Sequence, residues 1–204
     1  MFDVLCVTNR KLCSAEFMVQ IERIAKAGPA AVILREKDLP EREYRKLAAA
    51  VMDICKDSGT VCILHRFWET AAAMGAKAVH LPLPILRSMT AEDREQFAEI
   101  GASCHSREEA EEAAALGCTY IAVGHIFATD CKKGVPARGV EFLRDICNRS
   151  SIPVYAIGGV SSDNVRDVRW AGAAGVCVMS GLMCCENPKQ YIKQLKIGGN
   201  ADEV

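Results

Sequence analysis

The sequence predicts a single-domain (β/α)8 barrel, in which eight parallel strands each lead into a helix. Short apolar runs alternate with longer amphipathic segments along the whole chain, and the connections between them are short. Eight such pairs are present, and eight parallel strands close a barrel. The main alternative is an open, doubly wound sheet, but no GxGxxG sequence follows the first apolar run. The pattern therefore favours the barrel.

The domain boundaries follow from the chain length and from the composition of the C-terminus. A chain of 204 residues suffices for one compact α/β domain and is short for two. The final GGNADEV segment is polar and rich in glycine. We therefore expect a TIM-barrel domain at 1–196 and a disordered tail at 197–204.

The predicted strands are short runs of apolar residues that end at polar or glycine residues. Runs of this kind fit the strands of a parallel sheet, which are buried on both faces. The eight runs lie at residues 4–8, 31–34, 61–64, 78–81, 99–102, 120–123, 152–157 and 175–179.

The predicted helices show apolar residues at helical spacing between start and stop signals. Tyr44 and Val51 belong to such a set within the segment 40–58. Ser106 followed by Glu109 is a capping-box pattern. Helices are expected to open near Ser14, after Thr90 and after Ser106, and to cover residues 40–58, 68–74, 140–149, 162–171 and 188–196.

Composition narrows the class of protein and its partners. The net charge is −1 and the charges of both signs are mixed along the chain, so we expect no nucleic-acid partner. No apolar run approaches the roughly 20 residues of a membrane helix, and the N-terminus does not resemble a signal peptide, so we expect no membrane association. Most of the eleven cysteines lie in apolar segments, where thiols act as small core residues. This usage predicts a cytoplasmic, reducing location.

Polar residues gather where the predicted strands end, which is where barrel enzymes build their active sites. Arg35 and Lys37 follow the second strand, His65 the third and His125 the sixth, while Ser103 ends the fifth. Thr129 and Lys132 lie in the polar loop after the sixth strand. The two cations after the second strand suit a phosphate or carboxylate, although a structural ion pair with Glu36 explains their spacing equally well.

Two glycine turns follow the last two strands and predict a phosphate site. They contain Gly158 with Gly159, and Ser180 with Gly181. Glycine lets backbone N–H groups approach an anion closely, and barrels often bind phosphate after strands seven and eight. Tight turns without a ligand are the alternative for either pair alone. Two such turns on neighbouring strands favour phosphate.

Considered alone, the histidines do not identify a reaction. His125 suits proton transfer because an imidazole titrates near neutrality, but from this residue alone a core histidine bonded to a backbone carbonyl is the preferred interpretation. His80, within AVHLPLP, is interpreted as a core residue, and His105 as a residue that shapes the loop before a helix.

Taken in order, six segments resemble thiamine phosphate synthase and its relative TenI, a thiazole tautomerase. The segments are ILREK (33–37), GAKAVHLP (75–82), GASCHSREEA (101–110), GHIFATDCKKG (124–134), IPVYAIGGV (152–160) and AGAAGVCVMSG (171–181). The resemblance covers nearly the whole chain and implies a TIM barrel that forms a homodimer.

The resemblance also separates two reactions. The synthase joins a pyrimidine diphosphate to a thiazole phosphate and holds Mg²⁺ with aspartates after strands three and four. Here those stretches read His65-Arg66 and 82–85, PLPI, so both metal carboxylates are absent. After strand six the synthase has Gly-Pro, whereas this chain has Gly124-His125 as in TenI, whose histidine is the proposed acid/base.

These comparisons predict a cofactor-independent isomerase of the thiazole tautomerase type, acting on a phosphorylated thiazole. We expect His125 as the acid/base with His65 in or near the chemistry, and no metal site. Substrate contacts are expected from Arg35, Lys37, Ser103, Thr129 and Lys132, and phosphate contacts from Gly158, Gly159, Ser180 and Gly181. Two alternatives remain open, namely a Mg²⁺-dependent thiamine phosphate synthase and a non-catalytic phosphate-binding protein.

Overall fold

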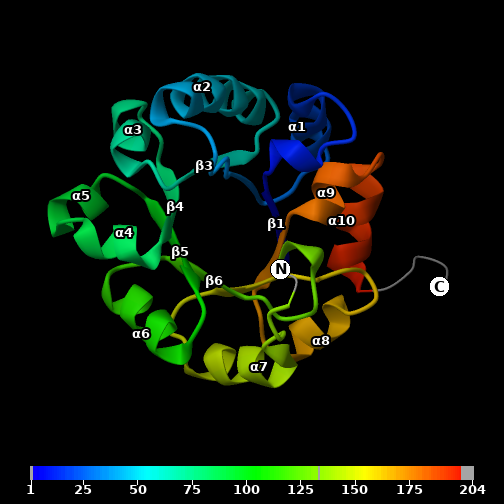
Figure 1. The fold of residues 1–204 in the computed structure, drawn as a ribbon. Helices are drawn as coiled ribbons and strands as arrows, with labels where there is room; N and C mark the ends of the chain where they lie inside the picture. The colour runs from blue at the N-terminus through cyan, green and yellow to red at the C-terminus, as the bar shows by residue number, and fades with distance from the viewer. Residues whose placement is uncertain (1, 133, 199–204) are drawn as a thin grey trace.

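The computed structural model describes residues 2–132 and 134–198, and its eight strands form one closed parallel barrel (Figure 1). Each strand pairs with the next along the chain, and the last pairs with the first. The predicted fold class is therefore confirmed. The strands are β1 (Asp3–Val7), β2 (Ala31–Leu34), β3 (Val61–His65), β4 (Ala78–Pro82), β5 (Glu99–Cys104), β6 (Tyr120–Gly124), β7 (Val154–Ile157) and β8 (Gly175–Val178).

Helices surround the barrel (Figure 1). The longest is α2, and most of the others are one to three turns long. The α-helices are α1 (Phe17–Lys26), α2 (Glu41–Asp57), α3 (Trp68–Ala73), α4 (Leu83–Ser88), α5 (Ala91–Glu95), α6 (Arg107–Ala115), α7 (Gly139–Arg149), α8 (Val165–Trp170), α9 (Ser180–Cys184) and α10 (Pro188–Ile197). Two 3-10 helices are present, η1 (Arg10–Leu12) and η2 (Asp130–Lys132).

Helix α4 and helix α9 are absent from the sequence-based prediction, because their residues resemble turns. Pro82 and Pro84 begin α4, and proline is tolerated in the first turn of a helix, where its missing N–H has no helical partner. Ser180 and Gly181 open α9 directly after β8. The turn predicted there is therefore the first turn of a short helix.

The predicted capping box at Ser106 is only half formed. The Ser106 hydroxyl accepts a hydrogen bond from the Glu109 N–H at 3.2 Å, as expected. The Glu109 carboxylate does not return to the Ser106 backbone and instead accepts from the N–H of His105 at 2.5 Å. A complete capping box occurs one helix earlier, between Thr90 and Asp93 at the start of α5.

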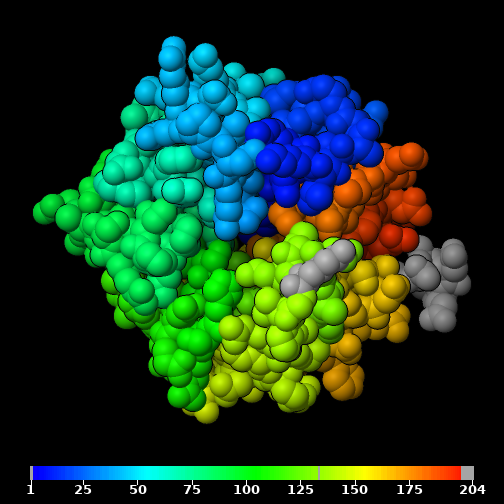
Figure 2. Space-filling view, viewed as in Figure 1, coloured from blue at the N-terminus to red at the C-terminus, as the bar shows by residue number. Residues whose placement is uncertain are grey.

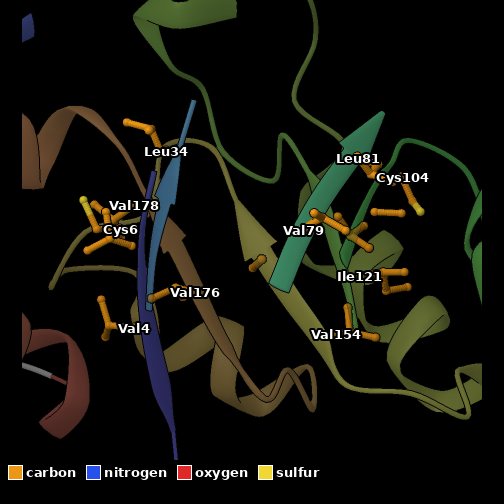
Figure 3. Close-up of a cluster of buried hydrophobic side chains, with 14 of the residues drawn as sticks. Val4, Cys6, Leu34, Val79, Leu81, Cys104, Ile121, Val154, Val176 and Val178 are labelled. Atoms are coloured by element: carbon orange, nitrogen blue, oxygen red, sulfur yellow. The ribbon is translucent and has the colours of Figure 1, made fainter. Parts of the chain in front are cut away.

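Alternate strand residues build two separate apolar regions. Val4, Cys6, Val176 and Val178 point out of the barrel towards the helices and belong to the larger core (Figure 3). The residues between them point into the barrel and pack with one another there. This inner set is Leu5, Val7, Ala31, Ile33, Ile63, Ala78, Tyr120, Ala122 and Cys177. The barrel is thus a packed core that is open for binding only at its end.

The C-terminal boundary differs slightly from the expected one. Ile197, placed in the tail by the sequence, is the last residue of α10, and Gly198 ends the helix in the left-handed conformation at φ 80°. Residues 199–204 lie outside the described residues, so the rest of the tail prediction stays a prediction. No described helix is long and apolar enough to cross a membrane. All eleven cysteines are free thiols.

Candidate active site

A cavity of about 680 Å³ opens at the C-terminal ends of the strands. This size suits a drug-sized molecule or two small substrates. All of the predicted site residues line it, so the structure brings together segments that lie far apart in the sequence. They are Arg35, Lys37, His65, Ser103, His125, Thr129, Lys132, Gly158, Gly159, Ser180 and Gly181.

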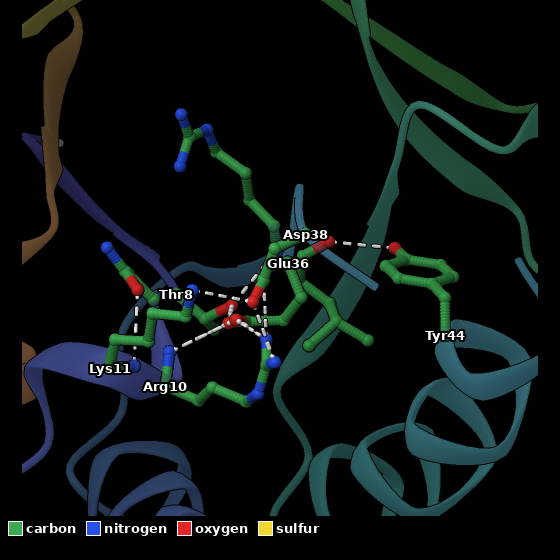
Figure 4. A network of polar contacts seen from close by, with 9 residues as sticks. Thr8, Arg10, Lys11, Glu36, Asp38 and Tyr44 are labelled. Carbon is green, nitrogen blue, oxygen red and sulfur yellow. Dashed lines mark hydrogen bonds and ion pairs between the residues drawn. The ribbon is translucent and has the colours of Figure 1, made fainter. Parts of the chain in front are cut away.

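In the segment after β2, the cationic side chains and the acidic side chains point to opposite sides of the chain. Arg35 and Lys37 line the cavity, whereas Glu36 and Asp38 turn away from it and bind Arg10 (Figure 4). Arg10 donates to Glu36 at 3.1 Å and to Asp38 at 2.6 Å. The alternating pattern excludes the simple interpretation in which Arg35 pairs with Glu36, because Glu36 is occupied on the other side of the chain.

Thr8 at the end of β1 holds this segment in place. Its hydroxyl donates to the Glu36 carboxylate at 2.7 Å and accepts the N–H of Arg35 at 2.9 Å. Tyr44 on α2 similarly donates to the carbonyl of Leu34 at 2.7 Å and accepts the N–H of His65 at 2.8 Å. These bonds fix the ends of β2 and β3, from which the cationic side chains extend.

The cations of the cavity have no carboxylate partner among residues 2–132 and 134–198. Every ion pair in that part of the chain joins other groups than Arg35, Lys37 and Lys132. Burial lowers the pKa of Lys37, and the neighbouring charges of Arg35, Lys132 and Arg66 lower it further. Burial likewise lowers the pKa of Arg35. The cavity therefore concentrates positive charge that an anionic ligand would neutralise.

The loop between β6 and α7 carries Thr129 and Lys132 across the mouth of the barrel. Its yellow-green atoms lie over that end of the molecule in Figure 2. The N–H of Lys132 donates to the Thr129 carbonyl at 3.0 Å within the 3-10 turn η2. Because Lys132 perturbs the pKa of Lys37, the loop brings its charge close to the β2 end.

His125 fastens the base of this loop. Its Nε2 lies 3.2 Å from the carbonyl of Val135, so that nitrogen carries a proton and donates it. Its carbonyl accepts the N–H of Arg138 at 3.0 Å. The side chain lines the cavity, but one ring nitrogen is committed to the loop backbone. This matches the alternative in which a buried histidine is satisfied by a carbonyl.

The two glycine turns lie side by side at the ends of β7 and β8, which are hydrogen-bonded neighbours. The Gly158 carbonyl accepts the N–H of Phe127 at 3.0 Å, and the Gly159 carbonyl accepts the Asn164 amide at 2.9 Å. No partner for the N–H of Gly159 or Val160 occurs among the described residues. With the carbonyls tied back, the N–H groups are left for an anion in the cavity.

The glycines themselves are required by close backbone packing. A Cβ on Gly159 would meet the carbonyl of Ala128 and the side chain of Phe127, and one on Gly181 would meet the hydroxyl of Tyr191. Gly158 and Gly159 also have φ of 96° and 68°, which L residues rarely adopt. A bulky substitution here would displace the neighbouring loop as well as any bound anion, so it is a poor test of phosphate binding.

Three further histidines lie in or next to the cavity, which His65 and His105 line. The rings of His65 and His80 stack with centroids 6.0 Å apart, and both are buried. Burial, assisted by the charges of His80 and Arg35, lowers the pKa of His65 to about 2, and burial lowers that of His80 to about 4. His105 lines the cavity and bonds through Nδ1 to the Gly124 carbonyl at 2.9 Å.

The sequence-based list missed several lining residues. Glu109 and Tyr191 come from helices α6 and α10, and Ser161 from the turn after β7. The predicted site residues came from the ends of strands and the loops after them, and of these three residues only Ser161 lies near a strand end. Gly181 leaves space for Tyr191, because a Cβ there would meet the Tyr191 hydroxyl, but this contact is visible only in the structure.

The donor set does not fit a magnesium ion. The cavity is lined by a single described carboxylate, Glu109, and one of its oxygens already accepts the N–H of His105. Glu36 is bound by Thr8 and Arg10. The residues described contain no group of three or more His, Cys, Asp or Glu side chains arranged for a metal. Mg²⁺ prefers several oxygen ligands, and the unpaired cations here repel it.

Comparison with known proteins shows which proteins the chain resembles over its whole length. A thiamine-phosphate synthase from Syntrophomonas wolfei subsp. wolfei is 32% identical over 202 residues, which is 96% of this chain and 95% of that protein. A thiamine-phosphate synthase from Methanoculleus marisnigri is 37% identical over 187 residues, covering 89% of this chain and 88% of the relative.

One solved structure agrees with these relatives, and a second shows the fold. The thiamine phosphate pyrophosphorylase from Pyrococcus furiosus superposes with a TM-score of 0.81 at 29% identity, over 96% of this chain and 94% of that one. A 3-hexulose-6-phosphate synthase superposes with a TM-score of 0.71 at 14% identity, over 97% of this chain and all of the other, and shares the fold alone.

These relatives correct the expected activity. The prediction of a thiazole tautomerase, with an isomerase mechanism through His125, is wrong, because the relatives at 32% and 37% identity are named thiamine-phosphate synthase. The transferase considered as an alternative agrees better with them. A family model described as thiamine monophosphate synthase matches residues 4–182, and this chain belongs to that family.

Proposed function

We propose that this chain is a transferase that joins a pyrimidine diphosphate to a thiazole phosphate, releasing thiamine phosphate and pyrophosphate. The names of the relatives support this reaction type. In it, the bond between a carbon and a diphosphate oxygen breaks, and the electron pair leaves with pyrophosphate. A bond from the same carbon to the thiazole nitrogen forms.

The observation that carries the proposal is the positive charge of Arg35, Lys37 and Lys132 in the cavity, which no carboxylate of the described residues pairs with. A diphosphate bears more negative charge than a single phosphate or carboxylate, and several cations match it. Arg35 suits paired oxygens because its guanidinium donates in a fixed fork. As the carbon–oxygen bond breaks, charge grows on the diphosphate, and cations already in place stabilise it without rearrangement.

The glycine turns after β7 and β8 are proposed to hold the phosphate of the thiazole substrate. The N–H groups of Gly159 and Val160, which have no partner among the described residues, and the Ser180 hydroxyl provide neutral donors that suit one phosphate. Between the two anion sites the cavity has an apolar floor, to which Val7, Ala122 and Ile157 contribute. Flat heterocycles would lie there, with their charged groups at opposite ends.

No step of this mechanism is assigned to Mg²⁺, because the residues of the cavity do not fit the ion. Arg66 follows β3 where the resemblance implies a metal-binding aspartate, and it contributes positive charge near Lys37. Charge on the diphosphate is therefore neutralised by side chains of this chain in the proposal.

The direct test is to incubate the purified protein with both substrates and follow thiamine phosphate by chromatography. Lys37→Gln should slow the reaction by about tenfold or more, since a charged hydrogen bond to the diphosphate is lost. Lys11→Gln provides a matched control, because it removes the same charge from a lysine that pairs with Asp38 outside the cavity. Absence of product from folded wild-type protein would reject the proposed function.

A further inference from the structure

The barrel interior contains two polar contacts of the same kind, in which a tyrosine hydroxyl reaches a polar side chain two strands away. In the first, the hydroxyl of Tyr120 on β6 lies 3.0 Å from Nδ1 of His80 on β4. In the second, the hydroxyl of Tyr155 on β7 donates to Asp3 on β1 at 3.3 Å. Each tyrosine reaches over the strand that separates it from its partner.

A glycine on the intervening strand makes each contact possible. The register places Gly101 between His80 and Tyr120, and Gly175 between Tyr155 and Asp3. A Cβ on Gly101 would collide with the phenol end of Tyr120. Gly101 has no positive φ, so its role is to leave space for this ring. A glycine at position 101 therefore leaves room in the barrel interior for the Tyr120 hydroxyl.

The contact between Tyr120 and His80 is connected to the candidate active site, whereas the contact between Tyr155 and Asp3 is not. Nε2 of His80 lies 2.8 Å from the hydroxyl oxygen of Ser103, which lines the cavity. Ser103 lies two residues after Gly101 on β5, so both face the interior and Ser103 is one layer nearer the mouth. Asp3 and Tyr155 do not line the cavity.

Tyr120, His80 and Ser103 form a row of hydrogen-bonded side chains. The positions of the protons along this row follow from counting donors and acceptors. His80 is buried at 4% exposure, which holds the ring neutral and gives it one donor and one acceptor nitrogen. The Tyr120 hydroxyl is buried as well, and within the described residues its one hydrogen-bond partner is His80 Nδ1. A buried hydroxyl needs an acceptor for its proton, so Tyr120 donates to Nδ1. The proton of His80 is then on Nε2 and is donated to Ser103.

From this order we infer that Tyr120 and His80 are positioning residues that keep the Ser103 hydroxyl free to donate into the cavity. Ser103 already accepts from His80, so its own proton points to a ligand. A fixed donor beside unpaired cations suits an oxygen of a phosphate or diphosphate. The inference rests on the proposed function for the identity of that anion, which we take to be the diphosphate.

The same order excludes a different use of the Ser103–His80 pair. A serine and a histidine at 2.8 Å match the geometry of a nucleophile and its base. A base must accept the serine proton, but Nε2 carries a proton of its own when Tyr120 donates to Nδ1. Ser103 is thus a hydrogen-bond donor to the substrate and not a nucleophile.

The tautomer of His80 is tested directly by two-bond ¹H–¹⁵N correlation spectra of the wild-type protein, with His80 assigned from a His80→Gln spectrum. We expect an Nε2–H imidazole that does not titrate between pH 8 and 6. A proton on Nδ1 would overturn the inference. This measurement needs neither substrate nor activity, and of the variants it needs only His80→Gln to fold, for the assignment.

Binding of inorganic pyrophosphate, measured by calorimetry, tests the consequence. Ser103→Ala should weaken binding about tenfold, and Tyr120→Phe about three- to tenfold, because Ser103 is then free to donate to His80 instead. In the Ser103→Ala background, Tyr120→Phe should add less than twofold, since it acts through Ser103. Tyr155→Phe is the matched control and should leave binding within twofold.

The outcomes separate this inference from the proposed function. Wild-type pyrophosphate affinity in a folded Ser103→Ala or Tyr120→Phe protein would overturn the role of the row, as would equal effects of Tyr120→Phe in both backgrounds. Failure of the wild-type protein to bind pyrophosphate would overturn it too. If binding and the double-mutant result are as expected while no thiamine phosphate forms, the positioning role stands and the transferase proposal fails.

Discussion

Replacing Arg35 with glutamine should weaken anion binding without weakening the fold. Arg35 is partly buried, has no carboxylate partner among the described residues, and lies near Lys37 and Lys132. Its charge is therefore desolvated in the free protein and repelled by Lys37, while Glu36 attracts it. Because burial is the largest influence on Arg35, removing its charge should leave the melting temperature the same or raise it. Residues placed for binding often oppose stability in this way.

The loss of affinity is set by the hydrogen bonds that the guanidinium makes to a bound anion. A hydrogen bond to a charged group contributes about 1.5–3 kcal/mol, which corresponds to a rise of roughly 10- to 150-fold in the dissociation constant of pyrophosphate. Some of the attraction is electrostatic and reaches solvent at the cavity mouth, so raising the salt concentration should narrow the difference between the wild type and Arg35→Gln.

The assay is calorimetric titration with pyrophosphate beside a thermal melt of each protein. Lys11→Gln again serves as the control, because it changes the net charge equally on an exposed lysine outside the cavity. The reasoning is refuted if Arg35→Gln melts several degrees lower while its pyrophosphate affinity equals that of the wild type. That combination would make Arg35 a structural residue.

Three other predictions concern pH, packing and metal. The pKa values of His65 and His80 are lowered to about 2 and about 4, mainly by burial, so below pH 6.5 the unfolded chain binds protons that the folded chain does not. Stability should therefore fall from pH 6.5 towards pH 4, by up to about 1.4 kcal/mol per pH unit for each histidine, and urea unfolding of the wild type and His80→Gln should show a shallower slope in the variant. Gly101→Ala should lower the free energy of unfolding by about 1–3 kcal/mol, because its Cβ meets the Tyr120 ring, and adding Tyr120→Leu should recover much of that loss. Equal denaturant midpoints for Gly101→Ala and for the double variant would contradict this. A chelator should leave the rate of thiamine phosphate formation unchanged, and activity that disappears and returns with added Mg²⁺ would show that the ion binds despite the donor set.

The sequence predicted the fold and the residues that line the cavity, because both depend on local patterns, while the roles given to those residues stay predictions. Apolar runs marked the strands, and the end of each strand marked the cavity, so all the predicted residues line it. The relation of Tyr120 to His80 was not predictable in this way. It depends on the register of two intervening strand pairings, and only that register shows why Gly101 is a glycine.

The predicted reaction failed for a different reason. The missing carboxylates after β3 and β4 describe how a metal would be held, and they say little about which bond the enzyme makes. His125 was weighted as an acid/base, whereas its Nε2 is bound to the Val135 carbonyl. The prediction thus gave the missing carboxylates and His125 more weight than the similarity of the whole chain, which agrees with the synthases.

Cationic and acidic residues alternate in the segment after β2. The charge of the side chains that face the cavity therefore depends on the length of that segment. Arg35 and Lys37 face inward only because Glu36 and Asp38 are held outward by Arg10. Inserting one residue between Leu34 and Arg35 would move Arg35 to the outward position and Glu36 to the inward one, as a one-residue slip does in an extended chain. The segment would then present a carboxylate to the cavity where it now presents a cationic side chain. A position that suits an anion would become one that attracts a cation, so a single-codon insertion offers a short evolutionary path between a charge-neutralising side chain and a metal ligand.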